Sequence, residues 1–435
     1  MINMIRNSKF ISDISDIGLL KTLMYIRMDV QVIIGLVFAV FAGMVIPETS
    51  KQMFWIGESY INLLGAPIGV LLFFSIVLAI LMLGSIDKLR RLGGVTISCY
   101  MLTTIVAAVL AVVIFTIISP GAGIDISSYF DHSQKPGDIT ITSFLKNLIP
   151  QSIVKPFVEN NAMQLVLMGT VFGIAGLVAS KESGKEIEVV KMVFAGINNA
   201  VMLYIKFIIA FTALGVCSIV ANTVARMGIE VILDLWKFVL AVLVALFVHG
   251  VILLPLIAFV LIRVFAKKTI NPYSYFMKVK EAVMLGFSTA SSMASIGMTM
   301  SVATDPNKGG IKEQVAEFVI PIGATINMDG TALYQALTAL FVAQALGYDY
   351  DLATQLTVVL VVIMASIGAS GIPGSGIILL SVVFTTLGLP IEALGVVIAV
   401  DRILDMFRTA LNVWGDLLTN LVVHHYNEYL ESKTS

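Results

Sequence analysis

The stretch PIGATINMDGTALY, residues 321–334, decides how the rest of the sequence is read. It lies inside an apolar segment, 315–346, that is long enough to cross a membrane as a helix. Its middle nevertheless carries Asn327, Asp329 and Thr331 among glycines. An ionisable side chain at membrane depth costs roughly 3 kcal/mol, and interrupted backbone there is tolerated where it lines a cavity. The stretch therefore predicts either a cation site built from a carboxylate and freed carbonyls, or a structural Asn–Asp pair.

The composition of the whole chain indicates a polytopic membrane protein. Of its 435 residues, 58% are hydrophobic and 13% are charged, and the mean hydropathy is +0.96. The net charge of −1 gives no reason to expect a nucleic-acid partner. No nucleotide-binding loop, catalytic triad or zinc motif is present in the sequence, so we expect neither an enzyme nor an organic cofactor. We expect His249 to be packed or hydrogen-bonded, and His424 and His425 to be exposed in the tail.

Loop charges predict the orientation of the chain in the membrane. Apolar spans are expected at 29–47, 54–84, 93–118, 161–180, 194–222 and 228–266. The loops after the second, fourth and sixth spans are basic, which places them on the cytoplasmic side together with the N-terminal segment 1–28. The acidic loop 119–160 is then extracellular, and the tail 423–435 is cytoplasmic.

Two later segments differ from simple spans. Residues 282–304 and 356–387 each read as two short apolar arms around a tip of small residues, serine-rich in the first and ASIGASGIPGSG in the second. The alternative of two kinked helices is weakened by the glycines and proline of the second tip, which would destabilise an unbroken helix. Paired interrupted segments in two halves point to the binding site of a transporter. We therefore predict two re-entrant hairpins, each followed by a span, 314–346 and 391–422, as inverted repeats.

The last span carries a polar stripe on an otherwise apolar helix. At about 100° per residue, the sequence DRILDMFRTALNVWGD aligns Asp401, Asp405, Arg408, Thr409, Asn412 and Asp416. A structural Asp405–Arg408 salt bridge would explain only two of these residues. A cation and an anion one turn apart also match a zwitterionic amino acid with an acidic side chain. Asp416 and the Asn412 carbonyl would then remain for a metal cation.

Together these motifs resemble the glutamate transporter family, the dicarboxylate/amino acid:cation symporters. The motifs are NMDGT at 327–331, the serine-rich hairpin, SIGASGIPGSG at 366–376 and D-x-x-R-T-x-x-N-x-x-x-D at 405–416. The resemblance covers nearly the whole chain and is greatest to prokaryotic sodium–aspartate/glutamate symporters. It implies an all-α membrane protein with eight transmembrane helices and two re-entrant hairpins, assembled as a homotrimer among the lipids of the cell membrane. Residues 29–84 and 161–222 would form a scaffold, and 93–118 and 228–422 a transport domain that moves like an elevator.

The resemblance also implies site residues. The substrate-binding residues would be Ser291, Ser292, Thr331, Gly371, Asp405, Arg408, Thr409 and Asn412. In this set Arg408 would pair with the substrate's side-chain carboxylate and Asp405 with its amino group. One sodium ion would use Asp416 with carbonyls of Gly323, Asn327 and Asn412. A second would use carbonyls of Thr325, Ser366, Ile367 and Ala369, and a third would use Tyr100, Thr103, Thr104, Asn327 and Asp329.

The implied function is sodium-coupled symport of L-aspartate or L-glutamate. Proton-coupled, C4-dicarboxylate and neutral amino acid symport are the alternatives within the family, and a passive anion channel is the alternative from another class. The presence of Asp329, Asp405, Arg408 and Asp416 argues against the family alternatives. The chain departs from archaeal relatives at Ala290, where they carry an arginine, so the role of Arg402 and any counter-transport of potassium stay open.

Overall fold

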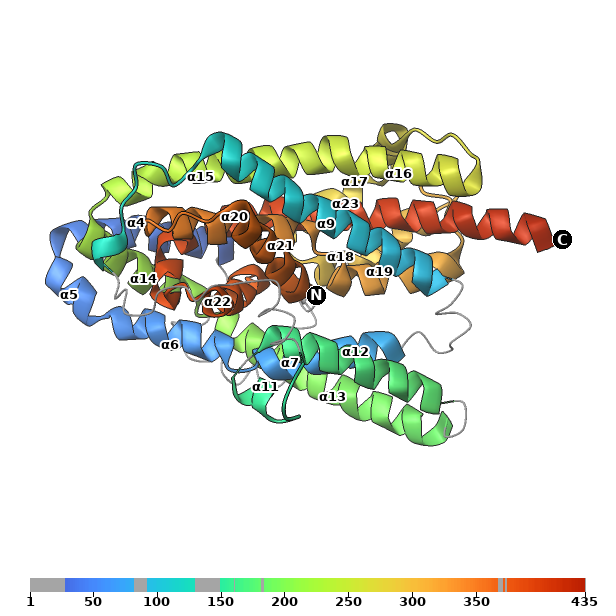
Figure 1. The fold of residues 1–435 in the computed structure, drawn as a ribbon, viewed down its shortest axis with the longest axis horizontal. Coiled ribbons are helices and arrows are strands. Elements are labelled where there is room, and N and C mark those ends of the chain that lie inside the picture. Colours follow the sequence, from blue (N-terminus) through green and yellow to red (C-terminus); the bar gives the residue numbers. More distant parts are fainter. Residues whose placement is uncertain are drawn as a thin grey trace.

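The computed structural model describes residues 28–81, 92–129, 149–159, 161–180, 184–366, 371 and 374–434. Its described elements are all helices, with no strand among them, which confirms the predicted all-α class. Most of the N-terminal segment 1–28 and the middle of the loop 119–160 lie outside the described residues. Figure 1 shows long helices running side by side, with the C-terminal helix α23 (Leu394–Thr434) emerging at one end.

The first group of helices packs around one apolar cluster. It comprises α4 (Met28–Val45), α5 (Pro47–Gln52), α6 (Phe54–Gly65), α7 (Ile68–Leu81), α12 (Ala162–Ala179), α13 (Gly184–Ile209) and α14 (Thr212–Met227). Helix α4 packs on α14, and α12 packs on α7. At Gly43 of α4 an added Cβ would overlap the carbonyl of Ala221 on α14, so the absence of a side chain permits this close crossing. The expected spans 54–84 and 194–222 are each broken, at 66–67 and at 210–211.

The second group surrounds a larger apolar cluster. It comprises α9 (Gly94–Ile118), α15 (Glu230–Phe247), η3 (Val248–Leu253), α16 (Leu254–Leu261), η4 (Ile262–Ala266), α17 (Pro272–Thr289), α18 (Ser292–Thr304), α19 (Glu313–Ile326), α20 (Asp329–Ala345), α21 (Leu352–Ser366), α22 (Ser375–Leu387), η5 (Ile391–Ala393) and α23. Two short helices, η2 (Ser127–Tyr129) and α11 (Lys155–Val158), belong to the connection between α9 and α12. Helix α23 contacts α15, α17, α19 and α20, so its polar stripe lies among the other helices of the group.

Three helical breaks lie where the sequence predicts interruptions. Helices α17 and α18 are joined at Ala290, whose φ of 48° is left-handed, and Ser291 caps α18 by accepting a hydrogen bond from the Ala294 amide. Helix α19 ends before Asn327, and α20 begins at Asp329. Helices α21 and α22 are separate elements, although most of the tip between them lies outside the described residues. The first hairpin, predicted over 282–304, starts ten residues earlier than expected. Its first arm, α17, begins at Pro272 because the Asn271 side chain caps it.

Length and composition identify a few uninterrupted membrane-crossing candidates among the described helices. These are Gly94–Ile118, Gly184–Ile209 and Ile232–Ala266, and the pair Val30–Val45 and Pro47–Leu63, bent by 119°, counts as a fourth if it forms one span. Of the other predicted spans, 54–84, 194–222 and 314–346 are divided by the breaks described above. The span 161–180 corresponds to the single shorter helix α12, and 391–422 lies within the unbroken α23. Large apolar side chains cover much of the outer surface, for example Val37, Phe38 and Phe41 of α4. Such a surface requires lipid or another apolar partner.

The cytoplasmic tail predicted at 423–435 is not a separate segment, because α23 continues without a break to Thr434. The expected exposure of His424 is wrong: this side chain is buried where the helix end packs on two loops. The Lys312 amide donates to His424 Nδ1 at 3.3 Å. Ion pairs join Lys268 to Glu428 at 2.8 Å and Lys312 to Glu431 at 2.6 Å. These contacts fasten the end of α23 to the loops 267–271 and 305–312.

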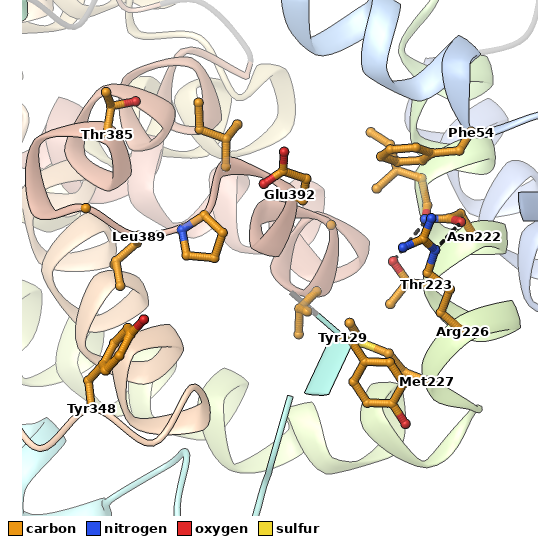
Figure 2. A pocket seen from close by; sticks show the side chains of 16 residues that line it. Phe54, Tyr129, Asn222, Thr223, Arg226, Met227, Tyr348, Thr385, Leu389 and Glu392 are labelled. Carbon is orange, nitrogen blue, oxygen red and sulfur yellow. Dashed lines mark hydrogen bonds between the residues drawn. The ribbon is translucent and has the colours of Figure 1, made fainter. Parts of the chain in front are cut away.

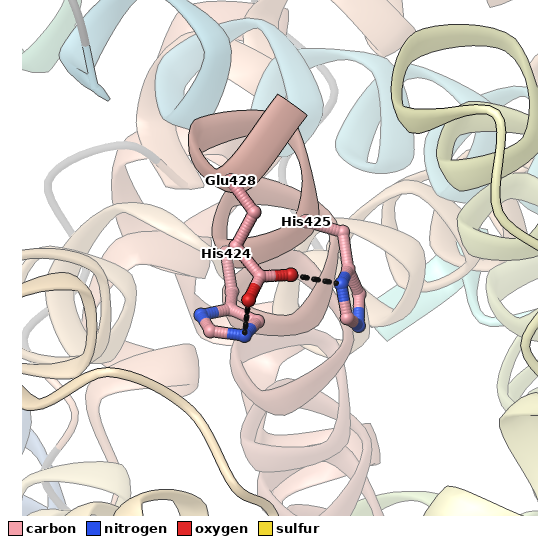
Figure 3. A group of neighbouring side chains, drawn as sticks. All are labelled: His424, His425 and Glu428. Carbon is pink, nitrogen blue, oxygen red and sulfur yellow. Dashed lines mark hydrogen bonds and ion pairs between the residues drawn. The ribbon is translucent and has the colours of Figure 1, made fainter. Parts of the chain in front are cut away.

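His424, His425 and Glu428 bring three potential metal-ligand atoms within 4.8 Å of one another (Figure 3). The hydrogen bond that His424 Nδ1 accepts places the ring proton on Nε2, the atom that faces Glu428. A metal ion needs a lone pair at that nitrogen, and Lys268 already pairs with the carboxylate. These surroundings shift the pKa values of two of the groups. Burial lowers the pKa of His424 to about 4, and the hydrogen bond from Lys268 lowers the pKa of Glu428 to about 2. The cluster therefore holds α23 against the loops 267–271 and 305–312.

The buried His424 at this contact predicts that the folded protein loses stability when the pH is lowered. Between the unfolded pKa of about 6.5 and the folded pKa of about 4, the unfolded chain binds more protons at His424 than the folded chain does. Stability should therefore fall as the pH is lowered through this window. His424→Asn keeps an acceptor for the Lys312 amide but does not titrate, so its melting temperature should fall less between pH 7 and pH 5. Equal pH dependence of the two melting temperatures in detergent would contradict this role.

Candidate functional site

A fully buried carboxylate, Asp329, lies at the start of α20 beside α9. Its Oδ1 atom accepts a hydrogen bond from Thr104 at 2.6 Å and lies 3.3 Å from the Thr103 hydroxyl. Its Oδ2 atom lies 3.2 Å from Nε2 of His249 on η3. The Tyr100 carbonyl, which the resemblance assigns to the same set, accepts from Thr103 at 3.1 Å. The structure thus brings Tyr100, Thr103, Thr104 and Asp329 together.

A second buried carboxylate, Asp416 on α23, faces the break between α19 and α20. Asn327 Nδ2 donates to Asp416 Oδ1 at 2.8 Å and lies 3.3 Å from the Asn412 carbonyl. The Oδ1 atom of Asn327 is buried without a hydrogen-bond partner among the described residues. Gly323 lies so close that an added Cβ would overlap Asp416 Oδ1. This arrangement collects Gly323, Asn327, Asn412 and Asp416 around one carboxylate and leaves an amide oxygen available.

Arg408 is the largest fully buried side chain of α23, and it is held by two acids. Its two terminal nitrogens donate to Asp401 Oδ1 and Asp405 Oδ1, each at 2.9 Å. Its guanidinium carbon lies 3.9 Å from the centre of the Tyr334 ring, close enough for a cation–π contact. The Nε atom has no hydrogen-bond partner among the described residues. Arg408 therefore retains one free donor although both of its terminal nitrogens are paired.

Asn412 links this stripe to the helical break. Its side-chain oxygen accepts from the Gly330 amide at 2.8 Å, and its side-chain nitrogen lies 3.5 Å from the Thr331 hydroxyl. At Gly330 an added Cβ would approach Arg408 backbone atoms to within 3 Å, so glycine permits α20 to contact α23. Thr409 is also buried on the same stripe. The close contact between the backbones of α20 and α23 therefore places Thr331 near Arg408, Thr409 and Asn412.

The tips of the two hairpins meet beside this region. Ser291 Oγ donates to the Gly371 carbonyl at 2.8 Å, and the Met293 amide donates to the same oxygen at 3.0 Å. Ser292 is buried, and an added Cβ at Gly371 would contact it. The amide of Gly374 donates to Asp405 Oδ2 at 3.0 Å, which ties the second hairpin to the stripe. Ser291, Ser292, Gly371 and Asp405 are thus neighbours in this conformation.

The remaining predicted set is described only in part. Ile367 and Ala369 lie outside the described residues. The hydroxyls of Thr325 and Ser366 donate to carbonyls of their own helices, at Ile322 and Ile363. The second cation set inferred from the resemblance therefore stays a prediction.

Sequence reasoning gave no site role to three buried side chains that the structure places here: His249, Asp401 and Tyr334. Asp401 was on the polar stripe, which was a usable signal, but pairing with Arg408 seven residues later depends on side-chain geometry. His249 was a lone polar residue in an apolar span, and only the packing of η3 against α20 places it beside Asp329. Tyr334 gave no polar signal because tyrosine is common in apolar helices.

Little free space adjoins the polar stripe. A cavity of about 30 Å³ lies beside Asp401, Arg402 and Asp405, against Tyr60 and Thr212, and is about large enough for one water molecule. A cavity of about 580 Å³ lies elsewhere, between α14 and the connection from α22 to α23 (Figure 2). Arg226 and Glu392 line it from opposite sides, and no predicted site residue does. The larger of these two cavities therefore does not adjoin Arg408.

The electrostatics of the polar core favour binding of cations. Arg408 contacts Asp401 and Asp405, Arg402 lies 3.8 Å from Asp405, and Asp416 has no cationic partner among the described residues. Asp329 contacts two hydroxyls and an imidazole. Buried charges are normally paired or coordinate a metal, so these carboxylates are suited to hard cations with oxygen ligands. The Arg408 guanidinium, with a free Nε, is suited to a carboxylate, and Arg402 adds a second positive charge beside Asp405.

Comparison with known proteins matches the chain to one family of symporters. The model of the sodium:dicarboxylate symporter family matches residues 28–426. A proton/sodium-glutamate symport protein of Bacillus caldotenax is 29% identical over 93% of this chain and 95% of its own length. A C4-dicarboxylate transport protein of Bacillus subtilis (strain 168) is 28% identical over 94% and 96% of the two chains. The human neutral amino acid transporter A is 30% identical over 79% of this chain and 70% of its own length.

The contact at Gly323 gives a direct test of the site geometry. Gly323→Ala places a methyl group against Asp416 and the Tyr100 hydroxyl, and overpacking of this kind costs about 1–3 kcal/mol. Its melting temperature should therefore fall clearly below that of the wild type. Gly196→Ala is the matched control, because a Cβ at that helical position meets open space and alanine favours the helix. If both variants melt like the wild type, Asp416 does not lie against Gly323.

Proposed function

The chain belongs to the sodium:dicarboxylate symporter family, and we propose that it carries L-aspartate or L-glutamate into the cell together with sodium ions. The observation that carries this proposal is the stripe of α23, on which Arg408 and Asp405 offer opposite charges next to Asp416. The amino acid has a carboxylate and an ammonium group for the first pair, and a cation would satisfy Asp416. Uptake into proteoliposomes with and without a sodium gradient tests the proposal.

Substrate binding requires exchange of partners at Arg408. The guanidinium already binds Asp401 and Asp405, and its free Nε lies on the edge that a side-chain carboxylate would approach. The substrate ammonium would take Asp405, which releases the terminal nitrogen of Arg408 for the incoming carboxylate. The α-carboxylate would lie at the N-terminus of α18, where Ser291 and Ser292 and the helix dipole favour negative charge. Each charged group of the substrate would thus meet an opposite charge or the N-terminus of a helix.

Opening of the second hairpin would admit the substrate. The Gly371 carbonyl is held by Ser291 and Met293, so these two hydrogen bonds must break before the tips separate. The bond from Gly374 to Asp405 must also break when Asp405 turns to the substrate ammonium. Binding and gate movement would therefore be coupled through Asp405.

Sodium ions would neutralise the carboxylates that have no cationic partner. One would join Asp416 and the free oxygen of Asn327, and another would join Asp329 with Thr103, Thr104 and the Tyr100 carbonyl. Asn412 connects the first set to the substrate residues through Gly330 and Thr331, which supports cooperative binding. Each net charge moved inward through about 100 mV contributes roughly 2.3 kcal/mol to accumulation.

The two apolar clusters support the proposed domains, and Met328, Leu379, Val382 and Ile398 of the second group pack into the first cluster where the groups meet. The helices α4 to α7 and α12 to α14 would be the fixed scaffold of a homotrimer, and the second group would move with the substrate. The relatives with C4-dicarboxylate and neutral amino acid names keep those substrate classes as alternatives. A C4-dicarboxylate has no ammonium group for Asp405, and a neutral amino acid has no side-chain carboxylate for Arg408. Both features favour an acidic amino acid.

Neutralising the cation ligands should weaken sodium-dependent binding. In Asp416→Asn and Asp329→Asn a desolvated cation loses its counter-charge, so we expect the sodium concentration needed for aspartate binding to rise at least tenfold in each variant. Isothermal titration with aspartate at several sodium concentrations measures the effect. Asp351→Asn, in the exposed segment before α21, is the control and should resemble the wild type. Unchanged sodium dependence in both core variants would refute the assignment.

Arg408 should determine substrate specificity. Truncating one partner of a buried charge pair costs about 2–5 kcal/mol, so Arg408→Cys should lower aspartate affinity by roughly 30-fold or more. Serine and alanine, which lack the side-chain carboxylate, should be affected much less. Arg408→Lys should recover only part of the affinity, because an ammonium group cannot donate the two parallel hydrogen bonds that a planar guanidinium gives to a carboxylate.

Competition by aspartate, glutamate and serine in proteoliposomes measures this shift. Arg226→Cys on α14 is the matched control, since it removes an arginine whose contact is with Asn222 outside the polar stripe. A uniform loss for all three competitors in correctly assembled Arg408→Cys would show that Arg408 only braces α23.

A further inference from the structure

His249 contacts Asp329 from the side opposite to the threonines. Both side chains are fully buried, and His249 Nε2 lies 3.2 Å from Asp329 Oδ2, whereas Thr104 and Thr103 lie at Oδ1. We propose that His249 is a positioning residue for the cation site at Asp329, whose carboxylate it holds with one hydrogen bond. The inference rests on the proposed cation-coupled function and adds a residue that is not itself a ligand.

The backbone around His249 forms an irregular turn, and hydrogen bonds from two other helices hold this turn in place. Residues Val248–Leu253 form η3, a π-helical turn, in which the Leu254 amide bonds to the His249 carbonyl. Such turns are rare and occur often at functional sites. The Gly250 carbonyl accepts from Trp414 at 3.0 Å, and the Val251 carbonyl accepts from Tyr273 at 2.7 Å. Two side chains from other helices thus fix the turn, and with it the direction of the imidazole.

The hydrogen bond sets the direction of the imidazole. An Asp329 carboxylate that binds a cation can only accept a hydrogen bond, so in the proposed site Nε2 of His249 is the donor. Nδ1 has no hydrogen-bond partner among the described residues. One hydrogen-bond donor orients the carboxylate without taking the place of the cation, whereas the charged group of a lysine or arginine at this position would cancel the charge of Asp329. Hydrogen bonds to a ligating carboxylate typically contribute 10- to 100-fold to metal affinity.

A purely structural role for His249 makes a different prediction. If it only joins η3 to α20, its loss should lower the stability of the protein by the same amount at every cation concentration. A positioning role should instead change the cation concentration that gives half of the stabilisation, because a cation that binds the folded state raises its melting temperature.

The experiment measures the melting temperature of the purified full-length protein against sodium concentration, with choline keeping the ionic strength constant. His249→Leu removes the donor, and we expect the half-saturating sodium concentration to rise about tenfold or more. His249→Gln can place an amide donor near Asp329 and should stay within about threefold of the wild type. In an Asp329→Asn background, His249→Leu should cause no further shift in this concentration, because the two residues act on one site.

Tyr273→Phe is the matched control. It removes a hydrogen bond from the same π-turn without touching Asp329, so it should lower the melting temperature at all sodium concentrations and leave the half-saturating concentration unchanged. If His249→Leu behaves like Tyr273→Phe, the proposal is overturned. Should His249→Leu not fold, His249→Met, another variant without the donor, is compared with His249→Gln by the same criterion.

Failure of the proposed function would be recognised separately. If lithium or potassium stabilises the wild type and sodium does not, sodium coupling is wrong, and the same variants decide the role of His249 with the effective cation. If no monovalent cation stabilises the wild type, no cation site exists for His249 to position, and this inference fails. Proteoliposome uptake of aspartate with and without sodium tests the transport function independently.

Discussion

The polar core depends on one constraint: a charge buried between apolar helices must be balanced nearby. Arg408 pairs with both Asp401 and Asp405, and Arg402 lies 3.8 Å from Asp405, so these four side chains form one network. Asp416 has only an amide donor, and Asp329 has hydroxyls and an imidazole. Loss of Arg408 would leave Asp401 without a cationic partner, which is costly at this depth. The helical breaks exist where backbone groups take part in this balance.

The breaks and close contacts make this balance geometrically attainable. Ending α19 at Ile326 and starting α20 at Asp329 puts Asn327 across from Asp416 and Asp329 against α9. Glycines at 323 and 330 bring the backbone into contact with α23, so the polar side chains need not be long to meet. Because these contacts cross several helices, a movement that opens one hairpin would disturb charge pairs on α23. Under the proposed function, shared residues such as Asn412 would couple the binding of cation and substrate.

Much of this arrangement could be predicted from sequence because membrane depth makes polar residues conspicuous. Asp329 and the stripe from Asp401 to Asp416 stood out against apolar surroundings, and the glycine-rich tips indicated helix breaks. Pairings across the fold could not be predicted in the same way. Periodicity suggested a pair between Asp405 and Arg408, but the second acid bound to Arg408, Asp401, depends on rotamers that periodicity does not specify. The burial of His424 depends on two loops packing on the end of α23, and no local pattern encodes that contact.

The two buried cation sets differ in how their carboxylates are held, and this difference has a mechanistic consequence. Asp416 is oriented by Asn327, which is itself part of the break in the backbone, so its geometry changes when the break rearranges. Asp329 is oriented by α9 on one side and by the π-turn of η3 on the other, two elements braced by further helices. Asp329 is therefore held from more sides than Asp416. In the proposed mechanism, the Asp329 set would bind its cation before the substrate, whereas the Asp416 set would reach its binding geometry together with the substrate residues around Asn412.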